Sequence, residues 1–166
     1  MTLESVGQYL QAETFARTIP AEKDVFGRSS FNRYYYATFL EARSLLAAFR
    51  EEWAVINHAS IPEVLRGTIV KEFKVAKTRA SRIGDKETLH GCSNAISAAK
   101  DLADLMQQGY AIRVVADYQP ETPVAFLASD AYSLNEISIK IARHWPGKAK
   151  ALANSIAAAN RLANVF

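Results

Sequence analysis

Apolar residues recur at steps of three and four along most of the chain, and this spacing predicts helices. Residues 3–17 carry apolar side chains at mostly helical spacing. Pro20 and Gly27 follow, and both residue types interrupt regular structure. A second helix is therefore predicted to begin at Ser29 or Ser30, which are good N-caps, and to run to about residue 54.

Two more helices are predicted before residue 120. Ser60 and Glu63 have the spacing of a capping box, and the apolar periodicity after them continues to Ala76. Gly84 is expected to end or kink this third helix. A fourth helix is predicted over about Thr88–Val115.

Two short helices are predicted in residues 121–166. Ser133 and Glu136 suggest a second capping box, and the stretch HWPG should stop the helix that follows it. The alanine-rich segment 148–164 favours a final helix.

No pair of strands with a hairpin turn and no internal repeat stands out. The pattern thus predicts an all-α bundle with a four-helix core plus C-terminal helices. We expect a single domain over residues 1–166, with its core at about 3–120 and a helical extension at 121–166.

Composition narrows the class of protein. The chain has 166 residues, 49% of them hydrophobic and 22% charged, which is typical of one globular domain. The lone Cys92 cannot form an internal disulfide, so a cytoplasmic location is the simplest expectation. The N-terminus has early charge and no long apolar run, so neither a secretory leader nor a membrane span is expected.

No cofactor or metal signature accompanies this pattern. The sequence has no Gly-rich phosphate loop and no nucleophile elbow. Its three histidines, His58, His90 and His144, lie far apart, whereas zinc ligands are usually closely spaced. We expect neither a cofactor nor a metal.

Three consecutive tyrosines next to Arg33 are the first candidate site. Tyr35 lies on the apolar stripe of the predicted helix, so it should belong to the core. Tyr34 and Tyr36 lie about 100° to either side, which places them at the rim with accessible hydroxyls. The alternative is that all three pack with their hydroxyls satisfied locally.

The second candidate site is the end of the fourth helix. Asp117 lies one turn from Arg113, and an aspartate at a helix C-terminus opposes the helix dipole unless a partner compensates it. We therefore predict that Arg33 pairs with Asp117 or a nearby carbonyl. Additional hydrogen bonds are expected from Tyr34, Tyr36 or Tyr118.

A basic run lies at the end of the third predicted helix and just beyond it. It comprises Lys71, Lys74, Lys77, Arg79 and Arg82, with Glu72 as the one acid among them. Such a run is either a solvated face or an RNA-binding patch, and salt-dependent binding would distinguish the two.

Both candidate sites resemble segments of one family. The stretch SSFNRYYYATFLEARSLL resembles the helix pattern of small stand-alone HEPN domains, and RVVADYQP resembles the segment that closes a later helix in that group. The resemblance covers about residues 5–120. The matching residues are Asn32, Arg33, Tyr35, Tyr36, Ala37, Phe39, Ala42, Arg43, Leu45, Leu46, Arg113, Ala116, Asp117, Tyr118 and Pro120.

The resemblance implies a helical bundle that is often dimeric. Family members are commonly RNA-cutting toxins, or accessory parts of defence and nucleotidyltransferase systems. Nuclease members carry an arginine followed by four to six residues and a histidine. Here Arg50 and His58, like Arg82 and His90, have seven residues between them, and Leu40 stands where relatives can carry histidine. The usual ribonuclease motif is therefore absent.

Two hypotheses follow. The first is an RNA-directed toxin or defence component, with Arg33 holding phosphate and His58 transferring a proton. The second is a non-catalytic module that binds a nucleotide, RNA or a partner protein. The expected partners are a second copy of the chain, a nucleotidyltransferase-type antitoxin and RNA. Candidate binding residues are Asn32, Arg33, Tyr34, Tyr36, Asp117 and Tyr118, and the candidate catalytic residues are Arg33 and His58.

Overall fold

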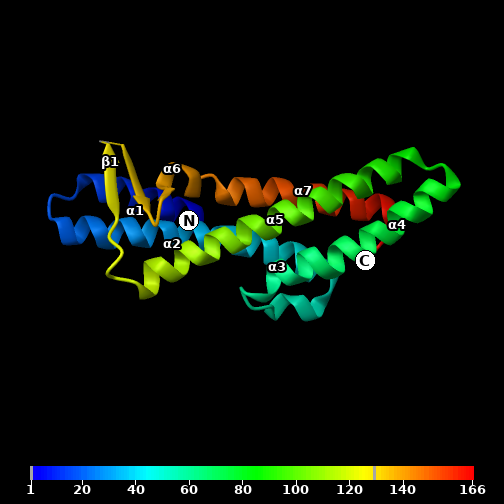
Figure 1. Ribbon diagram of the computed structural model, residues 1–166, viewed down its shortest axis with the longest axis horizontal. Helices are drawn as coiled ribbons and strands as arrows, with labels where there is room; N and C mark the ends of the chain where they lie inside the picture. The colour runs from blue at the N-terminus through cyan, green and yellow to red at the C-terminus, as the bar shows by residue number, and fades with distance from the viewer. Residues whose placement is uncertain (1, 129) are drawn as a thin grey trace. The chain divides into compact units, whose positions relative to one another are not determined.

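The computed structural model describes residues 2–128 and 130–166, and most of them are helical, as predicted (Figure 1). The chain forms two compact units. Unit one contains the residues up to Phe39 together with Gln108–Gly147, and unit two contains Leu40–Gln107 with Lys148–Phe166. The predicted extension, 121–166, is thus divided between the two units. The prediction of a single domain remains a prediction.

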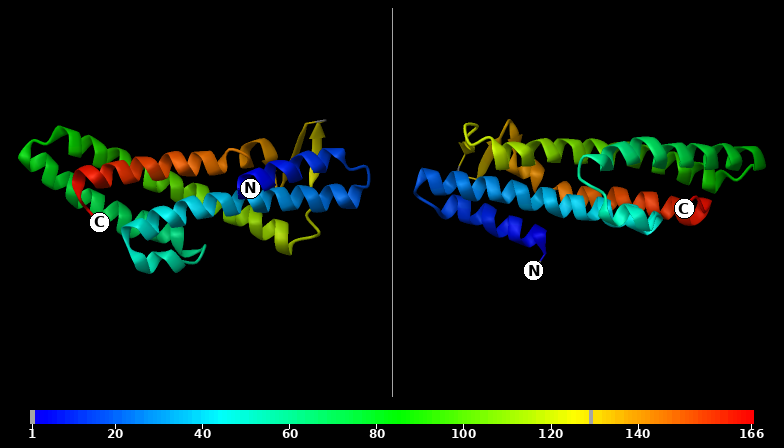
Figure 2. Two further views of the ribbon diagram at one scale, coloured as in Figure 1. Left: turned by 180° about the vertical axis from the view of Figure 1, so that it is seen from behind. Right: turned by 90° about the horizontal axis from the view of Figure 1, so that it is seen from below.

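The helices of unit one are α1 (Leu3–Ala16), the first part of α2 (Pro20–Phe49) and the last part of α5 (Lys86–Tyr118). The first of them confirms the predicted N-terminal helix. In Figures 1 and 2, α1 lies along the first part of α2. A methyl group on Gly7 of α1 would lie 2.9 Å from the ring of Tyr34 on α2, so glycine permits this close approach.

The predicted start of the second helix is wrong, because α2 begins at Pro20 rather than at Ser29 or Ser30. Proline is tolerated in a first helical turn, where its missing N–H has no partner to lose. Gly27 lies inside the helix, where it makes room for another segment. A side chain there would lie 3.2 Å from Val124. Both residues were interpreted as breakers, and both have helical roles instead.

The predictions of a helix beginning at Ser133 and of no strand pairs are also wrong. Three short strands, β1 (Ala125–Ala128), β2 (Ala131–Leu134) and β3 (Ile137–Ser138), form an antiparallel sheet in that order. Asn135 and Glu136 turn the chain between the last two strands with φ of 46° and 67°. Positive φ at both central residues is the geometry of the tight hairpin turn that asparagine favours.

Ser133 and Glu136 therefore form no capping box. The N-cap of the next helix, α6 (Ile139–Ala142), is Ser138, whose hydroxyl accepts from the Lys140 N–H. The chain then passes into α7 (Trp145–Ala163), with Pro146 in its first turn. The core of unit one gathers around Tyr132 of β2 and includes Phe31, Tyr34, Tyr35, Ile112, Val115, Leu134, Ile139 and Trp145.

Unit two begins with the last part of α2, which ends at Phe49 rather than near residue 54. Arg50 is extended, and a 3-10 turn, η1 (Glu51–Val55), follows it. The next helix starts at Ser60 as predicted, as α3 (Ser60–Val64). The predicted capping box does not form, since the Asn57 carboxamide oxygen accepts from both the N–H and the hydroxyl of Ser60.

The third predicted helix contains an irregular turn. A π-helical segment, η2 (Leu65–Ile69), joins α3 to α4 (Val70–Ile83). Gly84 ends α4 with φ of 73°, as predicted for a left-handed C-cap. The first part of α5 runs back beside α4, and the later part of α7 completes the unit (Figure 1).

The core of unit two is aliphatic, with one aromatic cluster. Its buried side chains include Leu46, Ile61, Leu65, Ile69, Phe73, Leu102, Met106 and Ile156. Phe166 stacks on Phe49 at 4.8 Å between ring centres. Within residues 2–128 and 130–166, none of the helices combines the length and apolarity that crossing a bilayer demands.

Candidate functional site

The two stretches that resemble HEPN segments meet in unit one. Asn32 of α2 donates a hydrogen bond to Asp117 near the end of α5. The Nε of Arg113 lies 2.9 Å from the other carboxylate oxygen of Asp117, and an Arg113 N–H donates to the Tyr36 hydroxyl at 3.4 Å. We call Asn32, Tyr36, Arg113, Asp117 and Tyr118 the Asp117 network.

Asp117 therefore has the compensating partners that its place at a helix C-terminus requires, but Arg33 is not one of them. The Arg33 guanidinium lies 5.9 Å from the centre of the Tyr36 ring. No hydrogen bond or ion pair joins Arg33 to Asp117, both of which the structure describes. The Asp117 carboxylate is paired instead with Arg113, which lies one turn away on the same helix. The predicted Arg33–Asp117 pair is wrong.

The three tyrosines differ from one another in their surroundings. Tyr35 is fully buried, as predicted, but Tyr34 is equally buried, so its predicted place at the rim is wrong. The Tyr34 hydroxyl donates to the Gln11 side chain at 2.7 Å, and burial raises the pKa of Tyr34 to about 12. Tyr36 is half-buried, which agrees with a rim position.

The charges of the Asp117 network neutralise one another. Burial alone would lower the pKa of Arg113, but hydrogen bonds to Tyr36 and Tyr118 and the charge of Asp117 raise it above its usual value. The Arg113 guanidinium also lies 5.2 Å from the centre of the Tyr118 ring, which is 66% exposed. The ion pair and the hydrogen bonds stabilise the contact between α2 and α5. Two buried atoms of the network, the Asn32 carboxamide oxygen and the Arg113 Nε, have no hydrogen-bond partner among the described residues.

Sequence analysis missed a second structural arginine in unit one. Arg28 is only 8% exposed, and its guanidinium donates to the carbonyls of Val115 and Gln119, both at 3.2 Å, at the end of α5. It donates as well to the carbonyls of Pro120 and Thr122, and it pairs with Asp24 at 2.5 Å. Arg28 therefore acts as a cap that adds charged donors at the end of α5, where the Val115 and Gln119 carbonyls also accept from the N–H groups of Gln119 and Thr122 at 3.1 Å. Asp24 and Arg28 have the spacing of an ion pair one helical turn apart, which could have indicated this role. The segment was interpreted as a loop, so the pair was not predicted.

The two candidate catalytic residues lie in different units. Arg33 belongs to α2 in unit one, whereas His58 lies in unit two, half-buried in the turn before α3. Among the described residues, no group of three or more histidine, cysteine, aspartate or glutamate side chains is arranged to hold a metal ion.

The basic run forms a continuous surface in unit two. Positions 71, 74, 75, 78, 79 and 82 follow one another at steps of three and four, so they share one face of α4. All six side chains are exposed. We call them the α4 stripe: Lys71, Lys74, Val75, Thr78, Arg79 and Arg82. The stripe contains four cations and no acid.

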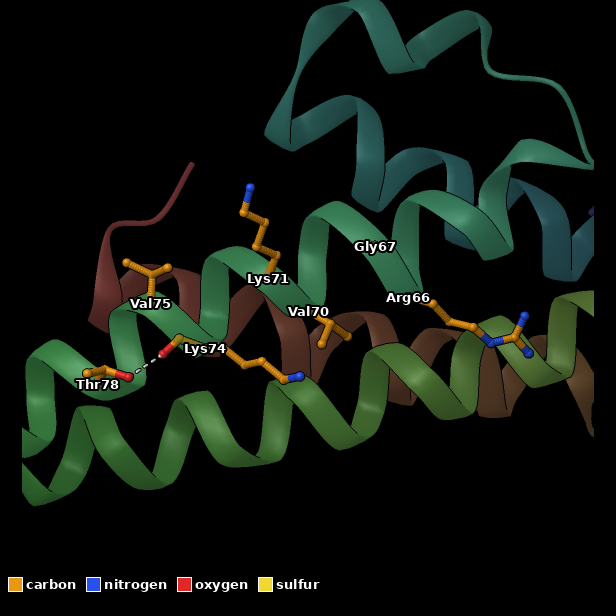
Figure 3. A pocket seen from close by; sticks show the side chains of 7 residues that line it. All are labelled: Arg66, Gly67, Val70, Lys71, Lys74, Val75 and Thr78. Atoms are coloured by element: carbon orange, nitrogen blue, oxygen red, sulfur yellow. Dashed lines mark hydrogen bonds between the residues drawn. The ribbon is translucent and has the colours of Figure 1, made fainter.

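Two grooves adjoin the α4 stripe and share Val75 and Thr78. One, of about 330 Å³, extends toward η2 and includes Arg66, Gly67 and Val70 (Figure 3). The other, of about 390 Å³, extends toward Ile83, which is 74% exposed. The stripe is therefore a hollowed surface with both charge and apolar contact area.

The side chains around the first groove differ in whether they have hydrogen-bond or ion-pair partners within the protein. Arg66, on the π-helical turn, is held by Asp104 and by Gln107 at 2.9 Å. The Thr78 hydroxyl donates to the Lys74 carbonyl at 3.0 Å (Figure 3). In contrast, the four cations of the stripe form no ion pair with any residue that the structure describes. Their charge is available to an anionic partner.

Two members of the basic run lie off the stripe. Lys77 is half-buried on the inner side of α4, and Glu72 lies on its flank, also half-buried, in a hollow that includes Arg79 and Asn164. The one acid of the run thus lies beside the α4 stripe rather than within it, and it shares a hollow with Arg79 of the stripe.

Comparisons with known proteins give no relative for this arrangement. The chain matches no protein-family model, no curated protein and no solved structure.

Proposed function

We propose that the protein is an RNA-binding helical module of the HEPN type, and that the α4 stripe is its RNA contact. The observation that carries this proposal is the stripe itself, which presents four cations without ion-pair partners beside two open grooves. Phosphate backbones bind such surfaces because each neutralised phosphate releases condensed counterions.

The composition of the stripe favours a nucleic acid over a membrane surface. An interfacial helix buries a face of large apolar side chains, commonly tryptophan, phenylalanine and leucine. The stripe has only Val75, which is 50% exposed, and Ile83 lies beyond its end. Arginine and lysine next to small grooves suit a flexible strand whose backbone follows the charges and whose bases occupy the hollows.

The resemblance supports the family assignment in this proposal. Its two segments contact each other through Asn32 and Asp117 and through Tyr36 and Arg113, as residues that jointly define one fold would do. The biological role proposed on this basis is a component of a toxin–antitoxin or defence system. A homodimer and a nucleotidyltransferase-type antitoxin are the partners that the resemblance implies.

We further propose that the module binds rather than cuts. The Asp117 carboxylate is already paired with Arg113 and Asn32, and the sequence lacks the arginine–histidine spacing of the nuclease members. A catalytic role for Arg33 with His58 is the alternative, and it predicts cleavage of RNA that fails in the His58→Ala variant. The binding proposal predicts intact RNA with both proteins.

The test uses fluorescence anisotropy with a labelled single-stranded RNA oligonucleotide at low salt. The variant Lys71→Gln/Lys74→Gln/Arg79→Gln removes three charges from the stripe. It should weaken binding on the order of tenfold or more, because counterion release scales with the number of phosphate contacts.

A matched control removes the same charge from another surface of unit two. Lys148, Lys150 and Arg161 are exposed on α7, so the variant Lys148→Gln/Lys150→Gln/Arg161→Gln has the same net charge as the stripe variant. The control should bind RNA nearly as well as the unmodified protein. Equal losses in the two variants would reduce the effect to net charge and reject the stripe as the contact. Vesicles of anionic lipid that outcompete the RNA would point to a membrane surface.

A further inference from the structure

Unit one contains a cavity that the Asp117 network and the α4 stripe do not explain. Its volume is about 560 Å³, within the roughly 300–1,000 Å³ typical of small-molecule sites. One wall is α1, and the other comes from α6 and from the hairpin, where strands form in place of the helix predicted from Ser133. The lining residues are Gln11, Phe15, Asp130, Lys140, Arg143 and His144.

The lining carries more positive than negative charge. Asp130, the one carboxylate in the lining, pairs with Lys140 at 2.6 Å. The side chains of Arg143 and His144 make no ion pair or hydrogen bond with any described residue. One guanidinium thus remains uncompensated at the cavity.

Gln11, on the α1 wall, adds a hydrogen-bond donor to the cavity. The oxygen of the Gln11 carboxamide accepts from the buried Tyr34 hydroxyl at 2.7 Å, so the nitrogen of the same amide is left to donate elsewhere. Arg143 lies close enough for its charge to oppose the effect of burial on the pKa of Tyr34. Gln11 and Arg143 therefore approach the same region from opposite walls.

Phe15 supplies an apolar surface beside these donors. Its ring is half-buried and packs at 5.3 Å, centre to centre, against Tyr132 of β2. Phe15 also lines the cavity, so it can contact the apolar part of a ligand there. A ligand complementary to this lining has several acceptor atoms on an anionic group and a flat apolar body.

We propose that this cavity binds a small aromatic anion, with Arg143 and the Gln11 amide on the anionic group and Phe15 against the ring. The shared chemistry of the ligand is a carboxylate or phosphate on a planar ring. Arginine recognises both, because its planar fork donates two parallel hydrogen bonds. The site lies in unit one and does not depend on RNA binding by the α4 stripe in unit two.

Isothermal titration calorimetry tests the proposal with three probes: phenyl phosphate, benzoate and the uncharged benzyl alcohol. At least one anion should bind saturably at millimolar concentration, and the tighter of the two identifies the anionic group. The Arg143→Gln variant should weaken that anion about tenfold, as expected when a charged hydrogen bond is lost. Arg143→Lys should retain part of the affinity, because it keeps the charge without the fork.

Arg161→Gln is the matched control, since Arg161 is an exposed arginine of α7 outside the cavity lining. It should leave binding unchanged. The proposal is overturned if neither anion saturates, if benzyl alcohol binds as tightly as the anions, or if Arg161→Gln weakens binding as much as Arg143→Gln does. Circular dichroism of each variant verifies that the fold is retained.

Discussion

The Asp117 network of unit one and the α4 stripe of unit two are built from the same residue types in opposite ways. In the network, Arg113 contacts a carboxylate and a tyrosine hydroxyl, and the side chains of Arg113 and Asp117 are 18% and 29% exposed. In the stripe, four cations face solvent and none is paired within the described chain.

This difference shows that a motif and a binding surface need not coincide. The residues that carry the family resemblance hold helices together, whereas the basic run, which carries no resemblance, keeps its charge free. Charges that are already compensated contribute to stability, and uncompensated charges contribute to association. The comparison therefore predicts that substitutions in the two regions affect different properties.

The largest effect on stability is expected for Arg28→Ala in unit one. The substitution leaves Asp24 without its ion-pair partner and removes a charged donor from the carbonyls at the end of α5. Removal of one partner from a buried charge cluster costs about 3–5 kcal/mol. Urea denaturation followed by circular dichroism measures the loss.

Arg79 of the α4 stripe is the matched control for Arg28. Arg79→Ala removes an exposed, unpaired guanidinium, so it should change the free energy of unfolding by no more than about 0.5 kcal/mol. If Arg79→Ala destabilised the protein as much as Arg28→Ala, the division between structural and available charges would be wrong.

A smaller loss is expected for Arg113→Gln. The Arg113–Asp117 pair is half-buried, so its loss should cost about 1–2 kcal/mol, between the values for exposed and buried pairs. Asp117→Asn should cost about as much, and the double variant should cost less than the sum of the two, because the residues share one interaction. Additive losses in this cycle would contradict a direct pair.

The buried tyrosines make unit one sensitive to alkali. An unfolded tyrosine loses its proton near pH 10, whereas burial holds the pKa of Tyr34 at about 12 in the folded protein. Between these values the unfolded state binds fewer protons than the folded state, so stability falls as pH rises. Below about pH 10 this contribution is constant.

Denaturation midpoints measured across this alkaline range test that expectation. Tyr34→Phe removes one titrating group, so its stability should fall less steeply with pH than that of the unmodified protein, even though the hydrogen bond to Gln11 is lost. Identical slopes for the two proteins would mean that Tyr34 is not protected by the fold.

The sequence predicted long amphipathic helices well and short elements poorly. Periodic apolar residues over 33 residues in α5 and 19 residues in α7 make both helices recognisable, and Gly84 marked the end of α4 correctly. The strands of the small sheet have two to four residues, too few for alternation to register. Pro20 and Gly27 misled the prediction, because their effect depends on a first turn and on a contact with Val124 that local sequence does not encode.

The candidate site shows the same division. Tyr35 could be assigned to the core from its place on an apolar stripe, and Arg113 with Asp117 from their spacing. The predicted partner of Asp117 was wrong because both Arg33 and Arg113 could have paired with this carboxylate. The pair forms with Arg113, which lies one turn away on the same helix. The cations of the α4 stripe are unpaired because of where the acidic side chains of unit two lie in the folded protein. Residue spacing along the sequence does not give those positions.

The salt dependence of RNA binding tests the central claim most directly. If the four cations of the α4 stripe contact phosphates, the logarithm of the association constant for single-stranded RNA should fall with the logarithm of salt concentration with a slope of about −3. Lys71→Gln/Lys74→Gln/Arg79→Gln should bring the slope to about −1, while Lys148→Gln/Lys150→Gln/Arg161→Gln leaves it unchanged. A slope near zero, or one that the stripe variant does not alter, would contradict the account.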